Sequence, residues 1–367
     1  MMRKIPLLKV HMPDSVQESL LKTLSSGFVT EGPRVAEFEK AAGEYIGNAN
    51  AAATNNCTSA IHIALQISGV GAGDEVVTTA MTCQATNQPI LKSGGKVVWA
   101  DIQPDTGNID PNDIKRKISN KTKAIIMMHW AGQPCDIDEI NLIAVEKGIK
   151  VIEDAASAFG AEYKGNKIGT ISDFTCFSFG AVKHITTGDG GMMTFKEKDN
   201  VERAILLRNH GTDKKAHRTE TEWDFNIYES AWKFSMNDIA ATIGIEQMKY
   251  QELLLEKRRS NADYYDKNLK DVSGLKILSR KNDRNSACWI YTVLVENKEG
   301  FVKALREKGI QTSIVHQRND IHPIYSSSRT DLPNLDYFYK RMINIPVGWW
   351  LSKEDIEYIV ESIKSGW

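Results

Sequence analysis

Short apolar runs alternate with longer helical patterns from about residue 50 to residue 200. The runs are typical of buried strands. They are EVVTTA (75–80), KVVWADI (96–102), KAIIMMHW (123–130), KVIEDA (150–155) and TCFSFG (175–180). Helical spacing of apolar residues appears between them, for example in TSAIHIALQIS (58–68) and DIDEINLIAVEKG (136–148). Strands separated by helices predict an α/β fold with a mainly parallel sheet that is covered on both faces.

The second half of the chain has a different pattern. Residues 207–230 are polar and aperiodic, which predicts a long loop. A helical pattern then runs from about Asn237 to Leu269, longer than the usual globular helix, so we expect it to pass from one domain into the next. The segments beyond it are CWIYTVLVE, a helical pattern at 299–308, GIQTSIVH and a terminal helix near 353–364. We therefore expect a large domain over residues 1–249 and a smaller α/β domain over residues 250–367.

Composition narrows the possible classes of protein. A chain of 367 residues can bury a large core, and 41% hydrophobic with 25% charged residues is ordinary for a soluble globular protein. The net charge of −1 argues against a nucleic-acid or anionic-membrane surface, and no apolar run is long enough to cross a bilayer. The five cysteines include no CxxC pair, so neither a disulfide framework nor a zinc site is supported. The N-terminal stretch lacks the central apolar region of a signal peptide, and we expect a cytoplasmic protein.

Polar segments follow the predicted strands or begin the predicted helices, where ligands gather in open α/β sheets. TNNCTSA (54–60) leads directly into a helix, and its hydroxyl and N–H groups are suited to a phosphate. A plain helix cap by Thr58 is the alternative. HWAGQPCD (129–136) ends a strand with His129, for which we favour a core or hydrogen-bonded role because no second ligand stands at metal spacing.

Two further segments carry a carboxylate and a lysine. VIEDAASAFG (151–160) ends a strand with Glu153 and Asp154; a buried carboxylate there would suit a protonated pyridine nitrogen, with a capping or ion-paired Asp as the alternative. FSFGAVKHITTGDGG (177–191) sets Lys183 between an apolar strand and a Thr/Gly-rich turn. A lysine beside a buried aromatic site can lose its proton and form a Schiff base, whereas a lone lysine is usually a solvated charge.

Together and in this order, these segments resemble the DegT/DnrJ/EryC1/StrS family of sugar aminotransferases, which use pyridoxal 5′-phosphate (PLP). The most specific part of the resemblance is the match of residues 178–191 to SF-x-x-x-K-x-[IL]-T-x-G-[DE]-GG. The other matching segments, which extend over nearly the whole chain, are NCTSAIHIAL, MTCQATN, HWAGQPCDID, VIEDAASAFGA, LRNHG, KFSMNDIAATIG and GIQTSIVH…HPIY…LP. The resemblance implies the aspartate aminotransferase fold (fold type I) and a homodimer with active sites between the subunits.

The resemblance also implies roles for matching residues. Lys183 would bind the cofactor covalently and move a proton, and Asp154 would pair with the pyridine nitrogen and make the ring an electron sink. Ser157 stands where the family often has glutamine or histidine near the phenolic oxygen, and Cys83 stands where an aromatic residue usually stacks on the ring. Phosphate contacts are implied for Thr58, Ser59, Ser178 and, from the partner chain, Lys233, a position that is often asparagine.

The resemblance favours transamination as the function. The donor would be L-glutamate or L-glutamine, and the acceptor would be a nucleotide-linked keto sugar. Three alternatives stay open: a small keto phosphate as acceptor, a PLP-dependent sugar dehydratase, and a PLP-binding protein without catalysis. Dehydratase relatives replace the lysine with histidine, whereas this chain has Lys183 with His184 only next to it. Acceptor contacts are expected from the 207–230 loop, Trp349, Trp350 and residues 316–320, above all from His316, Arg318 and Asn319.

Overall fold

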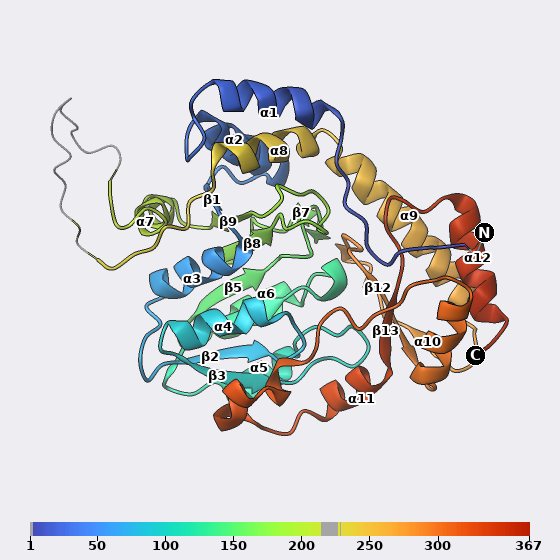
Figure 1. Cartoon of the computed structure of the whole chain (residues 1–367). Coiled ribbons are helices and arrows are strands. Elements are labelled where there is room, and N and C mark those ends of the chain that lie inside the picture. The colour runs from blue at the N-terminus through green and yellow to red at the C-terminus, as the bar shows by residue number, and fades with distance from the viewer. Residues whose placement is uncertain (1–2, 214–226, 228) are drawn as a thin grey trace.

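The computed structural model describes residues 3–213, 227 and 229–367, and a seven-stranded sheet lies at its centre (Figure 1). The strand order is β1-β9-β8-β5-β4-β2-β3. All neighbours from β8 to β3 are parallel, whereas β9 runs antiparallel to both β8 and β1. The strands are β1 (Ala51–Thr54), β2 (Glu75–Thr79), β3 (Lys96–Ala100), β4 (Thr122–Met128), β5 (Lys150–Asp154), β8 (Phe174–Ser178) and β9 (Gly191–Phe195). Each predicted strand overlaps one of them, and the predicted α/β fold with a mainly parallel sheet is confirmed.

Helices cover both faces of this sheet (Figure 1). They are α3 (Cys57–Ile67), α4 (Gln84–Lys92), α5 (Pro111–Lys117), α6 (Ile137–Lys147) and α7 (Asp199–Leu207), with α1 (Ser15–Ser25), α2 (Pro33–Ile46) and α8 (Asp238–Met248) packed together. Ile152 of β5 belongs to the apolar cluster of α3 and α4, and its neighbour Val151 belongs to the cluster of α6. Because side chains alternate along a strand, Asp154 points to the α3 face and Glu153 to the α6 face.

The prediction of one continuous helix from Asn237 to Leu269 is wrong. The segment forms α8 and α9 (Gln251–Leu269), and the chain leaves helical geometry at Tyr250, with φ −110° and ψ −3°. The glutamines on either side of the break are buried: the side chain of Gln247 donates to the carbonyl of His11 and that of Gln251 to the carbonyl of Phe159. These contacts hold the chain in the bend, and the apolar spacing gives no sign of them.

A second, antiparallel sheet contains β10 (Leu275–Ile277), β12 (Tyr291–Val295) and β13 (Met342–Ile345). Its apolar cluster includes Phe301 of α10 (Lys298–Glu307) and Ile359 of α12 (Lys353–Lys364), the latter of which matches the predicted terminal helix. The segment GIQTSIVH forms isolated bridges, through Ile310 and Ser313, instead of a strand. The other strands of the described residues are β6 (Glu162–Tyr163), β7 (Asn166–Lys167) and β11 (Arg284–Asn285), and the other α-helix is α11 (Pro333–Arg341).

Contacts cross the predicted domain boundary in both directions. Ile5 bridges to Ile310 and belongs to the apolar cluster of the second sheet, while Tyr325 and Phe338 pack with Trp99 in the cluster of the large sheet. A division into residues 1–249 and 250–367 stays a prediction. Most of the predicted 207–230 loop, namely residues 214–226 and 228, lies outside the described residues. None of the described helices is both long and apolar enough to span a membrane.

Candidate active site

The carboxyl ends of three parallel strands bring the candidate residues to one edge of the large sheet. Asp154 at the end of β5 pairs in register with Met128 of β4 and with Cys176 of β8. His129 therefore follows β4 at the same edge where Asp154 and Ser178 end their strands. Ligands of open α/β proteins bind at this edge.

The loop after β8 presents Lys183. At the base of the loop the N–H of Phe179 donates to the carbonyl of Gly190 over 2.8 Å, and a Cβ added to Gly191 would overlap the backbone of Asn56. The last glycine of the motif is therefore needed because β9 passes close to the start of α3. This packing fixes the ends of the loop that carries Lys183.

Lys183 is half-buried, and its Nζ lies 3.8 Å from the centroid of the Trp289 indole ring. Loss of contact with water lowers the pKa of the Lys183 ammonium, and the charges of Asp154, Cys57 and Cys83 oppose this shift. A lowered pKa leaves a larger fraction of the amine neutral and nucleophilic. The solvated surface cation that was the alternative does not describe this side chain.

Asp154 is buried, and both of its carboxylate oxygens accept hydrogen bonds. The N–H of Ala156 donates to Oδ1 over 3.0 Å, and the hydroxyl of Thr86 donates to Oδ2 over 2.5 Å. The oxygens of Thr82 and Thr86 lie 2.6 Å apart. Because the single hydroxyl proton of Thr86 goes to Asp154, Thr82 is the donor in this second bond. The two donors fix the orientation of the carboxylate.

The start of α3 is capped by Asn56, so the alternative in which Thr58 is a plain cap is wrong. Asn56 has an extended backbone, with φ −170° and ψ 166°, and its side chain accepts the N–H of Ser59 over 2.8 Å. The helix begins at Cys57, one residue before Thr58. Thr58 is half-buried and Ser59 is buried in the first turn, where N–H groups and the helix dipole favour an anion.

Three more of the predicted cofactor residues lie on neighbouring elements. Ser157 is buried, and its hydroxyl has no hydrogen-bond partner among the described residues. Cys83 is half-buried in the N-cap position of α4. Ser178 is half-buried at the end of β8; its Oγ accepts the N–H of Gly180 over 3.3 Å, which leaves its own proton free to donate.

Lys233 is exposed, and its ammonium donates to the hydroxyl of Ser235 over 2.8 Å. The same segment lies beside the end of β1, because the N–H of Asn55 donates to the carbonyl of Phe234 over 2.7 Å. The contact of Lys233 with a cofactor in the partner chain stays a prediction.

His316 is a predicted acceptor residue that shares a contact with Lys183, since both meet the ring of Trp289. Its ring stacks on Trp289, with centroids 5.8 Å apart and planes at 24°, and it meets the edge of Trp130. Its Nε2 is buried and has no partner among the described residues. Burial, and secondarily the charge of Lys183, lowers the pKa of His316 to about 4, so the ring is neutral at physiological pH.

The other predicted acceptor residues are held by protein groups. Arg318 forms ion pairs with Asp320 and Asp336. Asn319 is fully buried, and its amide donates to the carbonyl of Thr82 over 2.7 Å. These contacts give both residues structural partners in the segment that follows His316. Their contact with an acceptor stays a prediction.

Trp349 and Trp350 lie against the N-terminal segment of the same chain. The ring of Trp349 meets that of His11 edge to face at 5.0 Å, and the indole N–H of Trp350 donates to the carbonyl of Pro6 over 3.1 Å. These contacts within one chain account for the positions of both tryptophans. A role of either residue in acceptor binding stays a prediction.

His129 has the hydrogen-bonded core role that we favoured. Its Nδ1 accepts the N–H of Cys135 over 3.1 Å, so the ring proton is on Nε2 and is donated to Glu153 over 2.8 Å. Histidine, cysteine and carboxylate side chains form no cluster suited to a metal ion within the part of the chain that the structure describes.

Our reasoning from the sequence missed two residues that touch the candidate pair. Thr86 lies in the segment MTCQATN, but no spacing rule ties its hydroxyl to Asp154. Trp289 lies in CWIYTVLVE, where the apolar pattern predicts only a strand, and it meets Lys183 from a distant part of the chain.

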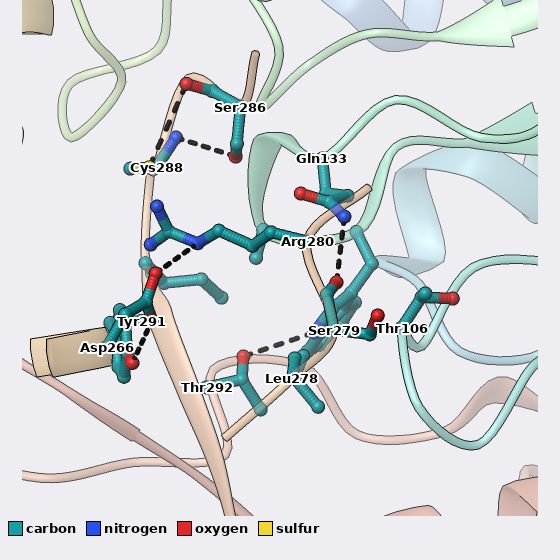
Figure 2. Close-up of a pocket in the computed structure, with 13 residues that line it drawn as sticks. Thr106, Gln133, Asp266, Leu278, Ser279, Arg280, Ser286, Cys288, Tyr291 and Thr292 are labelled. Carbon is teal, nitrogen blue, oxygen red and sulfur yellow. Dashed lines mark hydrogen bonds and ion pairs between the residues drawn. The ribbon is translucent and has the colours of Figure 1, made fainter. Parts of the chain in front are cut away.

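A small cavity of about 40 Å³ is lined by residues that include Gln133, Arg280 and Cys288 (Figure 2). Arg280 ion-pairs there with Asp266 over 3.0 Å, and Gln133 donates to the carbonyl of Ser279 over 2.9 Å. Lys183 and Asp154 do not line it. Its size and its internal bonding leave no room for a cofactor.

The residues present fit PLP. The oriented carboxylate of Asp154 is suited to a protonated pyridine nitrogen, and the amine of Lys183 to its aldehyde. The unpartnered buried hydroxyl of Ser157 needs a hydrogen-bond partner that an oxygen of a ligand would supply.

Comparisons with known proteins agree with this assignment. The sequence model of the DegT/DnrJ/EryC1/StrS aminotransferase family matches residues 11–364. The spore coat polysaccharide biosynthesis protein SpsC of Bacillus subtilis (strain 168) is 33% identical, over 96% of this chain and 94% of that protein. GDP-perosamine synthase of Escherichia coli O157:H7 is 31% identical, over 99% of this chain and 98% of that protein. The crystal structure of the sugar aminotransferase CalS13 from Micromonospora echinospora has a TM-score of 0.96 at 39% identity and covers 99% of this chain and 100% of that chain.

Aminotransferases of this family depend on PLP, and both the fold and the Lys183–Asp154 site of this chain agree with that cofactor. The chain therefore belongs to the DegT/DnrJ/EryC1/StrS aminotransferase family and is a PLP-dependent sugar aminotransferase.

Proposed function

We propose that this enzyme transfers an amino group from L-glutamate or L-glutamine to a nucleotide-linked keto sugar in amino-sugar or surface-glycan biosynthesis. The observation that carries the chemistry is the half-buried amine of Lys183, with its lowered pKa, at the strand edge where Asp154 is fixed. The proposed acceptor is based on the names of two relatives, since one is named for a GDP-linked sugar and another for a coat polysaccharide. The dehydratase and non-catalytic alternatives are set aside because the chain is an aminotransferase.

PLP supplies an electron sink when it is bound. Asp154, held by Thr86 and Ala156, would place a carboxylate beside the pyridine nitrogen and so favour a proton on that nitrogen. Lys183 would hold the cofactor covalently, and its freed amine would move a proton between the substrate carbon and the cofactor. Ser157 would donate to an oxygen of the cofactor, Cys83 would pack beside the ring, and Thr58, Ser59, Ser178 and the partner subunit's Lys233 would hold the phosphate.

We also propose a homodimer whose active sites lie between the subunits. Large apolar side chains are exposed on α1 and just after it, with Leu21 at 66% and Phe28 at 58% of their possible exposure. Neighbouring exposed apolar residues of this kind mark an association surface. Sedimentation at working concentration should give a dimer, and a fully active monomer would contradict the proposal. A cytoplasmic location is supported by the five cysteines, all of which are free thiols.

The acceptor is tested by offering the enzyme a panel of nucleotide-linked keto sugars and small keto phosphates. Each reaction contains either L-glutamate or L-glutamine, and mass spectrometry detects the aminated product. We expect amination of at least one nucleotide-linked keto sugar. Amination of a keto phosphate alone would replace the proposed acceptor and leave the aminotransferase assignment intact.

A further inference from the structure

Trp289 is held at its position by all of its hydrogen-bonding groups. Its backbone N–H donates to the carbonyl of Ala131 over 2.9 Å, and its indole N–H donates to the carbonyl of Val182 over 2.8 Å. Its carbonyl accepts from the buried guanidinium of Arg258 over 2.9 Å. The side chain is almost fully buried. The indole therefore cannot turn without breaking a buried hydrogen bond.

Two residues with unusual backbone geometry bring this tryptophan to the site. Ala131 has φ 59° and Cys288 has φ 49°, in the left-handed region that residues with a side chain rarely adopt. Their segments are joined by two backbone bonds, from Trp289 to Ala131 and from Ala287 to Gly132. Strained conformations persist where the surrounding structure determines them, and they cluster at functional sites.

The face of the fixed indole meets the amine of Lys183. At 3.8 Å from the ring centroid, a protonated amine is attracted by the negative face of the ring. This attraction favours the charged form of Lys183, whereas burial favours the neutral form. The other titratable groups that interact with this amine are its loop neighbour His184 and, from other elements, Asp154, Cys57, Cys83 and His316.

We propose that Trp289 is a positioning residue that holds the freed amino group of Lys183 in place and stabilises the ammonium form that this group takes after it has removed a proton from the substrate carbon. The inference rests on the proposed function, in which the freed Lys183 then passes that proton on. Trp289 supports this step because the negative face of its ring stabilises the ammonium. The indole N–H bond to Val182, the residue before Lys183, fixes the ring relative to the lysine backbone.

The test measures the pKa of Lys183 in the full-length enzyme after excess amino donor has released the lysine. Competitive acylation over a range of pH, followed by mass spectrometry of the peptide that contains residue 183, gives this pKa. Trp289→Leu removes the aromatic face and should lower the pKa by about one unit, so that labelling at a fixed pH below the pKa rises about tenfold. Trp289→Phe keeps a weaker face and should shift the pKa in the same direction by less. Trp367→Leu, which removes an indole that packs on Phe301, should leave the pKa of Lys183 unchanged.

An unchanged Lys183 pKa in folded Trp289→Leu would overturn the inference. If Trp289→Leu does not fold, Trp289→Phe decides the question, and an unchanged or raised pKa in that variant overturns it. The same labelling of the wild-type enzyme is the control that tests the proposed function itself. In the wild type, Lys183 should not be labelled before the donor is added and should be labelled afterwards. If Lys183 does not become accessible to the label, the proposed function fails.

Discussion

Two neighbouring carboxylates at the end of β5 have very different surroundings. Glu153 faces α6 and is completely buried; one of its oxygens accepts the Nε2–H of His129 over 2.8 Å and the other accepts the N–H of Ser172 over 3.3 Å. Asp154 faces α3, within electrostatic reach of Lys183 and close in sequence to the unpartnered hydroxyl of Ser157. Burial of a carboxylate therefore does not identify the site. The amine of Lys183 and the unpartnered hydroxyl of Ser157 near Asp154 distinguish it from Glu153.

The largest effect should come from Lys183→Ala. The change removes the covalent link to the cofactor and the group that moves the proton, so turnover should fall by at least about 10⁴-fold. Since the loop ends are fixed by backbone bonds, the variant should fold and still bind PLP through the other contacts. Steady-state kinetics and cofactor absorbance check both points. A surface lysine would instead change stability by only about 0.5 kcal/mol, with little loss of activity.

Asp154→Asn should have the next largest effect. The amide has nearly the same size but no charge, so the pyridine nitrogen loses its proton more readily and the rate should fall on the order of 10³-fold. Single-turnover kinetics measure this loss. Near-normal turnover would show that another group maintains the proton.

Thr86→Val should have a smaller effect on the same carboxylate. The variant removes the hydroxyl donor to Asp154, and a hydrogen bond to a charged group contributes about 1.5–3 kcal/mol, so we expect roughly a tenfold or greater loss of turnover. Thr86→Ser is the matched control, since it keeps the hydroxyl and should stay close to wild type. Equal loss in both variants would assign the effect to packing of the methyl group instead.

Glu153→Gln makes the same change from carboxylate to amide on the opposite face, and it should have the smallest effect on rate. One of the two N–H donors would lose its acceptor, which should lower the free energy of unfolding by about 1–3 kcal/mol. The activation free energy should change by less than about 0.5 kcal/mol, or about twofold in kcat. Urea unfolding and kcat measured on both amide variants would test the contrast. A rate loss in Glu153→Gln as large as in Asp154→Asn would remove the distinction between the two faces.

Much of the fold could be predicted from the sequence, because each parallel strand of the large sheet is a short apolar run that polar segments bound, whereas the buried strands β1 and β9 were not predicted. The break at Tyr250 was not predicted, and the buried glutamines that flank it bind backbone groups far away in the sequence, which the apolar spacing does not reveal. The cap of α3 by Asn56, in place of the alternative cap by Thr58, could not be predicted because several residues suited to capping stand in one run.

The residues of the candidate site that belong to specific sequence segments could be predicted. The residues that reach the site only through tertiary contacts could not. Lys183 and Asp154 stand in specific segments, and the structure places both at one strand edge. The position of Trp289 depends on the left-handed backbone of Cys288 and on the hydrogen bond from the Trp289 N–H to the carbonyl of Ala131. No apolar pattern in the sequence reveals either feature. The ion pair of Arg318 with Asp336 and the hydrogen bond from Asn319 to Thr82 could not be predicted, because these partners lie far away in the sequence.

The central claim is that Lys183 carries the cofactor. Borohydride reduction of the wild-type holoenzyme, followed by digestion and mass spectrometry, tests it directly because reduction makes the link between lysine and cofactor permanent. We predict one cofactor-bearing peptide, and that this peptide contains residue 183. Modification of a different lysine, for example Lys233, would contradict the account.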